Sequence, residues 1–240
     1  MSRRPSARLL QEGQVDPNKP EAGLVAAFCA AALSTRIEDP AEVLQNAVAH
    51  GIGHAALTDN FIADAVRRLG ALWAEDRISW TDVTIGTARL QSLLRQMDKG
   101  IDAGLAKRPD APRVMLVSGV DMAHTFGPML LAHQMRRQGI SVALSLETTP
   151  GTVCEIFGKT APDAVFLTAS HCDGVETLAQ LVKEVRVFNS GIPIVVGGPL
   201  LCTETDIARL IGADFATSDL EKALTLCDLR ILTARKFVNP

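Results

Sequence analysis

The stretch Val114–Gly127, VMLVSGVDMAHTFG, indicates how the second half of the chain folds. A short aliphatic run, Val114–Val117, leads through a polar loop into an apolar helical pattern over Met129–Met135. Similar short runs recur further along, separated by amphipathic helical stretches: Val142–Leu146, Ala164–Thr168, Ile194–Gly198 and the weaker Asp214–Thr217. Strands that are apolar throughout are typical of a parallel sheet covered by helices on both faces. Five such units predict an α/β, flavodoxin-like (Rossmann-type) five-stranded parallel sheet, whose ligands bind beyond the carboxyl ends of the strands.

The first half of the chain has helical periodicity instead. Apolar side chains recur at spacings of three and four in four successive segments between Glu21 and Leu105. Asp39-Pro40 predicts the start of the second segment and Gly51 its end. In the fourth segment we expect Ile85 to point into the core. Four helices joined by short turns predict an N-terminal antiparallel four-helix bundle.

A change of composition separates these two halves. Lys107–Pro112 (KRPDAP) combines two prolines with charged residues, as a linker does. We therefore expect a flexible tail over residues 1–20, a helical bundle cap over 21–106, a linker over 107–112 and an α/β domain over 113–240. The pairs Arg67-Arg68 and Arg136-Arg137 are predicted to lie on solvent-facing helix surfaces.

Composition limits the classes of function. The 240 residues carry a net charge of -3, without the basic excess of a stand-alone nucleic-acid binder, and tyrosine is absent. Five scattered cysteines without a CxxC pair argue against a disulfide scaffold or a zinc ribbon. The N-terminus lacks an export signal, and its most apolar stretch, Leu24–Leu33, is shorter than the roughly 20 residues that cross a bilayer. The sequence thus predicts a cytoplasmic protein without a membrane anchor or sequence-specific DNA binding.

One histidine stands at the carboxyl end of the first predicted strand. His124 could bind a metal through one ring nitrogen while an acceptor, nearest Asp121, orients the other. Gly127 would let the next helix begin close to a bulky planar ligand. A single loop histidine can equally be a surface residue or a partner in a helix cap, and these residues alone leave both interpretations open.

Small residues follow the third and fourth predicted strands. Ser170 comes just after Thr168, and Gly197-Gly198 ends the fourth strand. Small groups at neighbouring strand ends leave a slot that could admit the tail of a long ligand. The alternative is ordinary strand-to-helix turn chemistry, which uses the same residue types.

In this order, His124-x-x-Gly127, Ser170 and Gly197-Gly198 resemble the motif of cobalamin-binding domains of the methionine synthase and methylmalonyl mutase type. That motif is Asp-x-His-x-x-Gly, then Ser-x-Leu, then Gly-Gly. The resemblance implies that His124 is the lower axial ligand to the cobalt of cobalamin. It also implies that the displaced dimethylbenzimidazole tail enters between Ser170 and the glycine pair.

Two positions depart from that motif. Met122 stands where the family has its aspartate, with Asp121 one residue earlier, and Cys172 replaces the leucine. The first change affects the hydrogen bond that orients the histidine, and the second affects packing around the tail. The resemblance implies a cofactor-binding set that comprises Asp121, Met122, His124, Thr125, Phe126, Gly127, Ser170, Cys172, Gly197 and Gly198.

The helical half carries a second resemblance. Leu69–Trp73 (LGALW), followed by Ile78 and Trp80, is similar to the helical cap of methionine synthase-like proteins and CarH-type photoreceptors. This implies that Trp73 lies over the upper face of the cobalt and joins the cofactor-binding set. Val83-Thr84 stands where those photoreceptors carry a Glu-His pair, so no upper histidine is expected. Packing inside the bundle is the alternative role for both tryptophans.

The whole arrangement most resembles the AerR/PpaA regulators of bacterial photosynthesis genes. The resemblance implies a non-enzymatic, light-linked cobalamin sensor that prefers hydroxocobalamin, as a monomer or weak dimer. It also implies an antirepressor role towards a separate DNA-binding repressor of the CrtJ/PpsR type. A corrinoid methyl carrier has the same fold, and an axial histidine also suits a haem-binding redox sensor, so both remain alternatives.

A further pair of histidines, His50 and His54 in HGIGH, has the i, i+4 spacing of a metal site on one helix face. No glutamate follows His50, and the two glycines weaken a helix, so a role at a helix end is favoured.

Overall fold

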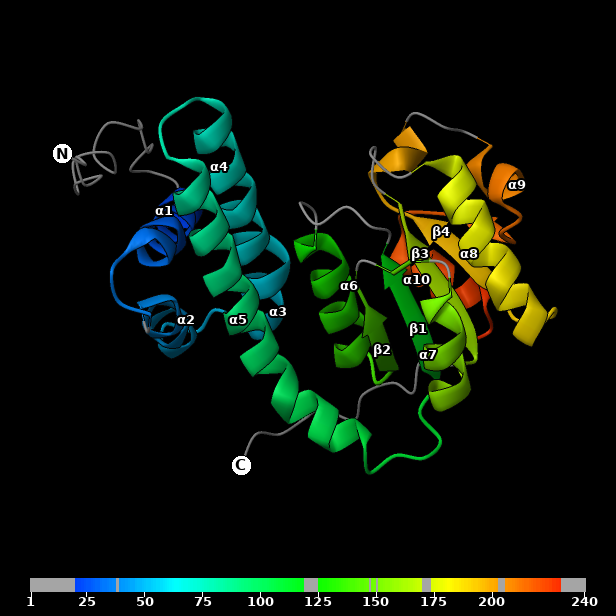
Figure 1. Cartoon of the computed structure of the whole chain (residues 1–240). Helices are drawn as coiled ribbons and strands as arrows, with labels where there is room; N and C mark the ends of the chain where they lie inside the picture. Colours follow the sequence, from blue (N-terminus) through cyan, green and yellow to red (C-terminus); the bar gives the residue numbers. More distant parts are fainter. Residues whose placement is uncertain are drawn as a thin grey trace. The chain divides into compact units, whose positions relative to one another are not determined.

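Helices form the N-terminal part of the chain (Figure 1). The computed structural model describes residues 20–37, 39–118, 125–146, 148–149, 151–169, 174–202 and 206–229. Its N-terminal helices are α1 (Pro20–Leu33), α2 (Asp39–Ala49), α3 (His54–Ala56), the π-helical segment η2 (Leu57–Ile62), α4 (Ala63–Ala74) and α5 (Trp80–Leu105). Segments α3, η2 and α4 follow one another without a break, so the predicted four helical segments are confirmed. The chain divides into two units, Met1–Met97 and Asp98–Pro240, and the division falls inside α5.

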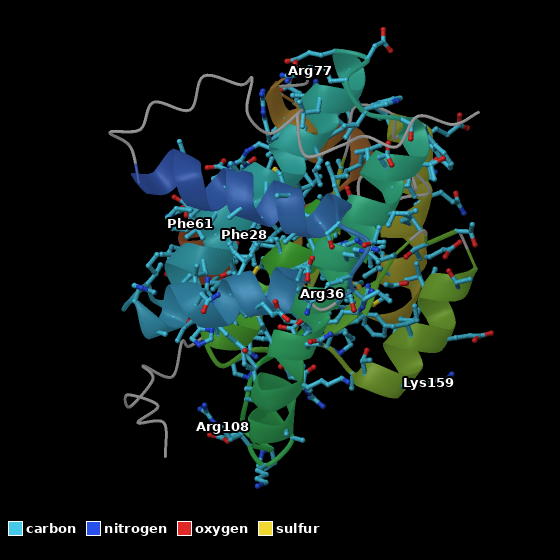
Figure 2. All side chains as sticks on the ribbon, turned by 90° about the vertical axis from the view of Figure 1, so that its left-hand side faces the viewer. Phe28, Arg36, Phe61, Arg77, Arg108 and Lys159 are labelled. Atoms are coloured by element: carbon cyan, nitrogen blue, oxygen red, sulfur yellow. The ribbon has the colours of Figure 1, made fainter. Side chains whose placement is uncertain are left out.

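Apolar side chains fill the interior of the first unit. Phe28 of α1, Leu69 of α4 and Leu90 of α5 are completely buried, and Figure 2 labels Phe28 on α1 and Phe61 on η2. The prediction that Ile85 points inward is wrong, because 47% of its surface is exposed. Gly86 occupies the inward position: a Cβ there would lie 3.1 Å from Leu69 Cδ1. Helix α5 therefore meets its neighbours through a glycine at this turn, one residue further round the helix.

Gly51 ends α2 as predicted. Its φ is 87°, and its amide donates to the Val48 carbonyl at 2.9 Å, while the Ile52 amide donates to Ala47 at 3.1 Å. This pattern is a Schellman motif, which needs the left-handed backbone that glycine adopts freely.

The second unit is built around a parallel sheet. Its strands are β1 (Arg113–Ser118), β2 (Ser141–Ser145), β3 (Ala164–Thr168), β4 (Ile194–Gly197) and β5 (Phe215–Ala216), and all four pairings are parallel. The order β2-β1-β3-β4-β5 confirms the predicted flavodoxin-like sheet. The remaining elements are α6 (Phe126–Arg137), α7 (Thr152–Thr160), α8 (Val175–Phe188), the 3-10 turn η4 (Pro199–Cys202), α9 (Ile207–Ile211) and α10 (Leu220–Leu226).

Strand side chains alternate between the two faces of the sheet. Leu116 and Phe166 pack in one core with residues of α6 and α10, whereas Met115 and Val165 pack in another with residues of α7, α8 and α9. The central strands β1, β3 and β4 are mostly apolar because helices cover both faces of the sheet (Figure 1). Burial of this apolar surface, at about 25 cal/mol per Å², is the main force that holds the helices to the sheet.

The expectation that Arg136 faces solvent is wrong. Its side chain is 11% exposed, and its guanidinium lies 2.9 Å from carboxylate oxygens of both Asp98 and Asp102. Helix α5 continues to Leu105, and its last turns belong to the second unit, where these carboxylates meet α6. By contrast, the Arg67 side chain is 70% exposed, as predicted.

Within the described ranges, the chain contains no helix that combines the length and the apolar character needed to cross a bilayer.

Candidate functional site

Three strands end side by side at the carboxyl edge of the sheet. The register pairs Ser118 of β1 with Thr168 of β3, and Thr168 with Gly197 of β4. The segments expected to carry the ligand-binding groups follow these strand ends. Of the predicted site residues, Asp121, Met122, His124, Ser170 and Cys172 lie outside the described residues. The strand ends on either side of them, the start of α6 and the glycine pair are described.

Helix α6 begins at this edge. Thr125 is its N-cap and is half-buried, Phe126 is 8% exposed, and Gly127 is exposed. Among the described residues, no atom other than those of its chain neighbours and its own helix backbone lies within 4 Å of the place that a Gly127 Cβ would occupy. Pro128 is tolerated in the first turn because the first amides of a helix have no partner within it. Packing among the described residues thus does not require glycine at position 127.

Gly197 and Gly198 have the opposite character. A Cβ at Gly197 would lie 2.8 Å from the Thr217 carbonyl oxygen, and one at Gly198 would lie 2.5 Å from the Ala169 carbonyl oxygen. Gly198 also has a φ of 110°, in the left-handed region. The Ala169 amide donates to the Gly197 carbonyl at 2.8 Å. Backbone packing between the ends of β3, β4 and β5 therefore accounts for both glycines without any ligand.

A small pocket opens beside this glycine pair, under α6 and α10. Its volume is about 50 Å³, enough for a few water molecules. Its apolar walls come from helices α6 and α10 and from the sheet, and its polar side comes from the ends of β3 and β5. The lining comprises Leu131, Phe166, Leu167, Thr168, Val195, Gly197, Thr217, Ser218, Asp219, Leu220 and Ala223.

The polar side of the pocket is a well-ordered helix start. Asp219 caps α10: its carboxylate accepts a hydrogen bond from the Lys222 amide at 3.1 Å, and its own amide donates to Thr217 Oγ1 at 3.1 Å. An N-cap carboxylate stabilises the helix by about 1 kcal/mol. The turn from β5 into α10 is consequently fixed in place next to Gly197.

The two tryptophans of the first unit are exposed. Trp73, near the end of α4, is 48% exposed, and Trp80, at the start of α5, is 66% exposed. Burial in the bundle core, the alternative role for these side chains, is therefore wrong. Exposed aromatic surface of this size is available for a ligand or a partner.

The His50–His54 pair is not a metal site in the described structure. His50 Nδ1 lies 2.7 Å from the Asn46 carbonyl oxygen at the end of α2, which confirms its role at a helix end. His54 opens α3 and is exposed. No group of three potential metal-binding side chains occurs among the described residues.

Two cysteines are buried thiols. Burial raises the pKa of Cys29 to about 11, against a smaller lowering by the Arg68 charge. Burial also raises the pKa of Cys227 to about 11, and the Asp214 charge adds to it. Because the thiolate is the reactive form, neither group is suited to nucleophilic chemistry near neutral pH.

Sequence reasoning missed the α10 side of the pocket and the polar cluster on α6. The run Ser218-Asp219-Leu220 carries an N-cap signal that predicts a helix after the last strand. The cluster combines His133 and Arg136 of α6 with Asp98 and Asp102 of α5. Their matching i, i+3 and i, i+4 spacings could have suggested two helices that face each other.

Comparisons with known proteins agree with this architecture. No family model matches the chain. The chain is 29% identical, over 170 residues, to an uncharacterized 20.5 kDa protein in the bchF-crtJ intergenic region of Rhodobacter capsulatus. The aligned region covers 70% of this chain and 88% of that protein.

Among solved structures, the chain is similar to the monomethylamine corrinoid protein of Methanosarcina barkeri. The TM-score is 0.64 with 13% identity, over 85% of this chain and 94% of that one. A cobalamin-binding protein from Desulfitobacterium hafniense has a TM-score of 0.44 and 15% identity, over 85% of this chain and 97% of that one. The first similarity establishes the fold: a helical part followed by a Rossmann-like domain, as in a known corrinoid protein.

Proposed function

We propose that the chain is a cobalamin-binding regulatory protein in which His124 ligates the cobalt. The proposal is supported by the position of Gly127, an exposed glycine in the first turn of the helix that follows His124. Among the described residues, no atom outside its chain neighbours and its own helix backbone lies within 4 Å of where its Cβ would be, which leaves room for a bulky planar group against the start of α6. Bound cobalamin would supply a cobalt centre whose upper ligand can be exchanged.

The pocket between α6 and α10 supports the same proposal. It lies beside Gly197, on the side of the sheet where Phe166 and Leu131 provide apolar walls and Thr168 and Ser218 provide hydroxyl groups. These residues would hold the benzimidazole tail of the cofactor once its place on the cobalt is taken by His124. The pocket must widen from about 50 Å³ to admit such a group, which the side chains between two helices can allow.

A regulatory role is proposed from the curated relative. The name of that protein places its gene between bchF and crtJ, and the AerR/PpaA resemblance points to a repressor of the CrtJ/PpsR type as partner. In this proposal the protein is not an enzyme. Cofactor binding favours one arrangement of the chain, and that arrangement binds the repressor. We further propose a preference for hydroxocobalamin over adenosylcobalamin, because the smaller upper ligand fits more easily beneath Trp73.

A corrinoid methyl carrier is the second candidate, favoured by the similarity to the monomethylamine corrinoid protein. The two candidates share the fold and the ligand, so activity has to separate them. Sustained methyl transfer to or from the reduced, cobalamin-loaded protein would establish the carrier. A haem sensor would instead show a Soret band that His124→Ala abolishes.

Gly127→Leu tests the cofactor site. Because Gly127 is exposed and its added Cβ would contact no described atom beyond its own helix and chain neighbours, the melting temperature is expected to stay constant or to rise slightly, since leucine favours a helix over glycine by up to about 1 kcal/mol. Retention of hydroxocobalamin after gel filtration is expected to fall by about tenfold or more. Gly158→Ala in α7, where a Cβ also meets nothing within 4 Å, is the control and should bind as the wild type does. Equal retention by Gly127→Leu and wild type would contradict the proposed site.

A further inference from the structure

Helix α6 carries a buried polar cluster on the flank that faces α5. His133 is 1% exposed and Asp98 is 8% exposed. The Asp98 carboxylate accepts from His133 Nδ1 at 2.6 Å through one oxygen and from the Arg136 guanidinium at 2.9 Å through the other. Arg136 also reaches Asp102 at 2.9 Å and donates to the Val142 carbonyl at 3.1 Å. One cluster thus joins α5, α6 and β2 within the second unit.

Stability alone does not explain this cluster. Removing the Asp98 carboxylate and the Arg136 guanidinium from water costs several kcal/mol, and apolar side chains of similar volume often serve as well or better. His133 Nε2 adds to the cost, because it is buried without a hydrogen-bond partner among the described residues. The cluster does fix the orientation of α6. Asp98 can accept from both His133 and Arg136 only when α6 has one rotation and one axial position relative to the last turns of α5.

The same helix positions the parts of the candidate site. Its first turn contains Gly127 and directly follows the His124 loop, and Leu131, one turn later, forms part of the pocket wall. His133 and Arg136 come on the next turn. A helix is stiff over three turns, so a rotation fixed at residues 133 and 136 is transmitted to residues 127 and 131.

We propose that Asp98 and His133 are positioning residues of the cofactor site: they fix the rotation of α6 and thereby the approach of His124 to the cobalt. This inference rests on the proposed function.

The test combines two variants with a matched control. Asp98→Asn removes the shared carboxylate, and the triple variant Asp98→Leu, His133→Leu, Arg136→Met replaces the polar cluster by apolar packing. Asp163→Asn is the control, because Asp163 is also ion-paired, to Arg113, but lies before the amino end of β3. Each full-length protein is measured for its melting temperature and its hydroxocobalamin affinity. After reduction to cob(II)alamin in protein labelled with ¹⁵N-histidine, electron paramagnetic resonance reports the fraction of cobalt whose lines are split into doublets by a histidine nitrogen rather than into triplets by the benzimidazole nitrogen.

The triple variant is expected to melt no lower than the wild type, yet to bind hydroxocobalamin about tenfold more weakly and with a smaller nitrogen-coordinated fraction. Asp98→Asn should show the same loss of coordination, and Asp163→Asn should not. If the triple variant keeps both the affinity and the nitrogen splitting of the wild type, the inference is overturned, even where Asp98→Asn fails to fold. If the wild type itself binds no hydroxocobalamin, the proposed function fails, and this inference fails with it.

Discussion

Glycines at the carboxyl edge of the sheet separate what the fold needs from what a ligand would need. A Cβ at Gly198 would lie 2.5 Å from a backbone oxygen, whereas one at Gly127 would meet nothing within 4 Å. Both positions are glycine and both belong to the motif that the sequence resembles, so the sequence alone does not distinguish their roles. The structure gives a backbone reason for Gly198, whereas among the described residues no contact requires glycine at position 127.

Gly198→Ala is therefore expected to damage the fold. The left-handed φ of 110° and the close Ala169 oxygen both oppose a side chain, and strain of this kind costs at least about 2 kcal/mol. The melting temperature should fall by about 4–8 °C. Thermal unfolding followed by circular dichroism measures the change. A melting temperature within 1 °C of the wild type, on the order of experimental error, would show that the contact relaxes freely.

Cys29 predicts a loss of stability at alkaline pH. Burial raises its pKa from 9.0 to about 11 in the folded protein, so the folded state resists loss of the proton. The stability that the neutral thiol contributes is complete below pH 9 and is lost as the pH rises towards about 11. Tyrosine, which also titrates in that range, is absent.

Chemical unfolding at pH 8 and at pH 10.5 measures this loss of stability. The two conditions lie on either side of the ordinary thiol pKa of about 8.5–9. The wild type should lose more free energy of unfolding between the two conditions than Cys29→Ala does, by about 1–2 kcal/mol. Identical losses in the two proteins would mean that the Cys29 thiolate is accommodated in the folded state.

At the scale of elements, hydrophobic pattern predicts most of the sheet. Each of the five strands lies at one of the predicted aliphatic runs. A short run of this kind is typical of a strand in a parallel sheet, because such a strand can be covered on both faces. The pattern predicts α5 less well. Its buried face includes a glycine, Gly86, and the buried carboxylate in its last turns, Asp98, pairs with Arg136 of α6. Polar contacts between helices leave no periodic apolar signal.

Helix α10 contributes one wall of the pocket, so a substitution in α10 tests whether the pocket holds the benzimidazole tail. Ala223 is 3% exposed and lines the pocket, so Ala223→Leu would fill the space at a cost of about 1–3 kcal/mol. We expect hydroxocobalamin binding to weaken by about tenfold, and binding of cobinamide, which lacks the benzimidazole tail, to change little. Titration of both ligands against both proteins measures this. An equal loss for the two ligands would place the tail elsewhere.

At the scale of the whole molecule, the chain consists of two units. The helical unit has exposed tryptophans, and the α/β unit has an exposed glycine in the first turn of α6. Trp73 and Trp80 are 48% and 66% exposed, so replacing either by alanine removes only part of a buried side chain and is expected to cost about 1–3 kcal/mol. If Trp73 covers the upper face of the cofactor, Trp73→Ala should reduce the preference for hydroxocobalamin over adenosylcobalamin by about tenfold. Trp80→Ala is the matched control and should leave the preference unchanged.

Equilibrium binding of both cobalamins in the dark measures that preference. The same preference ratio in wild type and Trp73→Ala would remove Trp73 from the site. A ratio near one in the wild type would contradict the proposed discrimination between the two forms.

The central claim is a bond between the His124 imidazole and cobalt. The most direct measurement is electron paramagnetic resonance of the cob(II)alamin-loaded protein, prepared with ordinary and with ¹⁵N-labelled histidine. An axial histidine nitrogen splits each cobalt line, and labelling changes a triplet to a doublet. We predict this change for the wild type and its absence for His124→Ala. A splitting that does not respond to the label, or that survives unchanged in His124→Ala, would contradict the account.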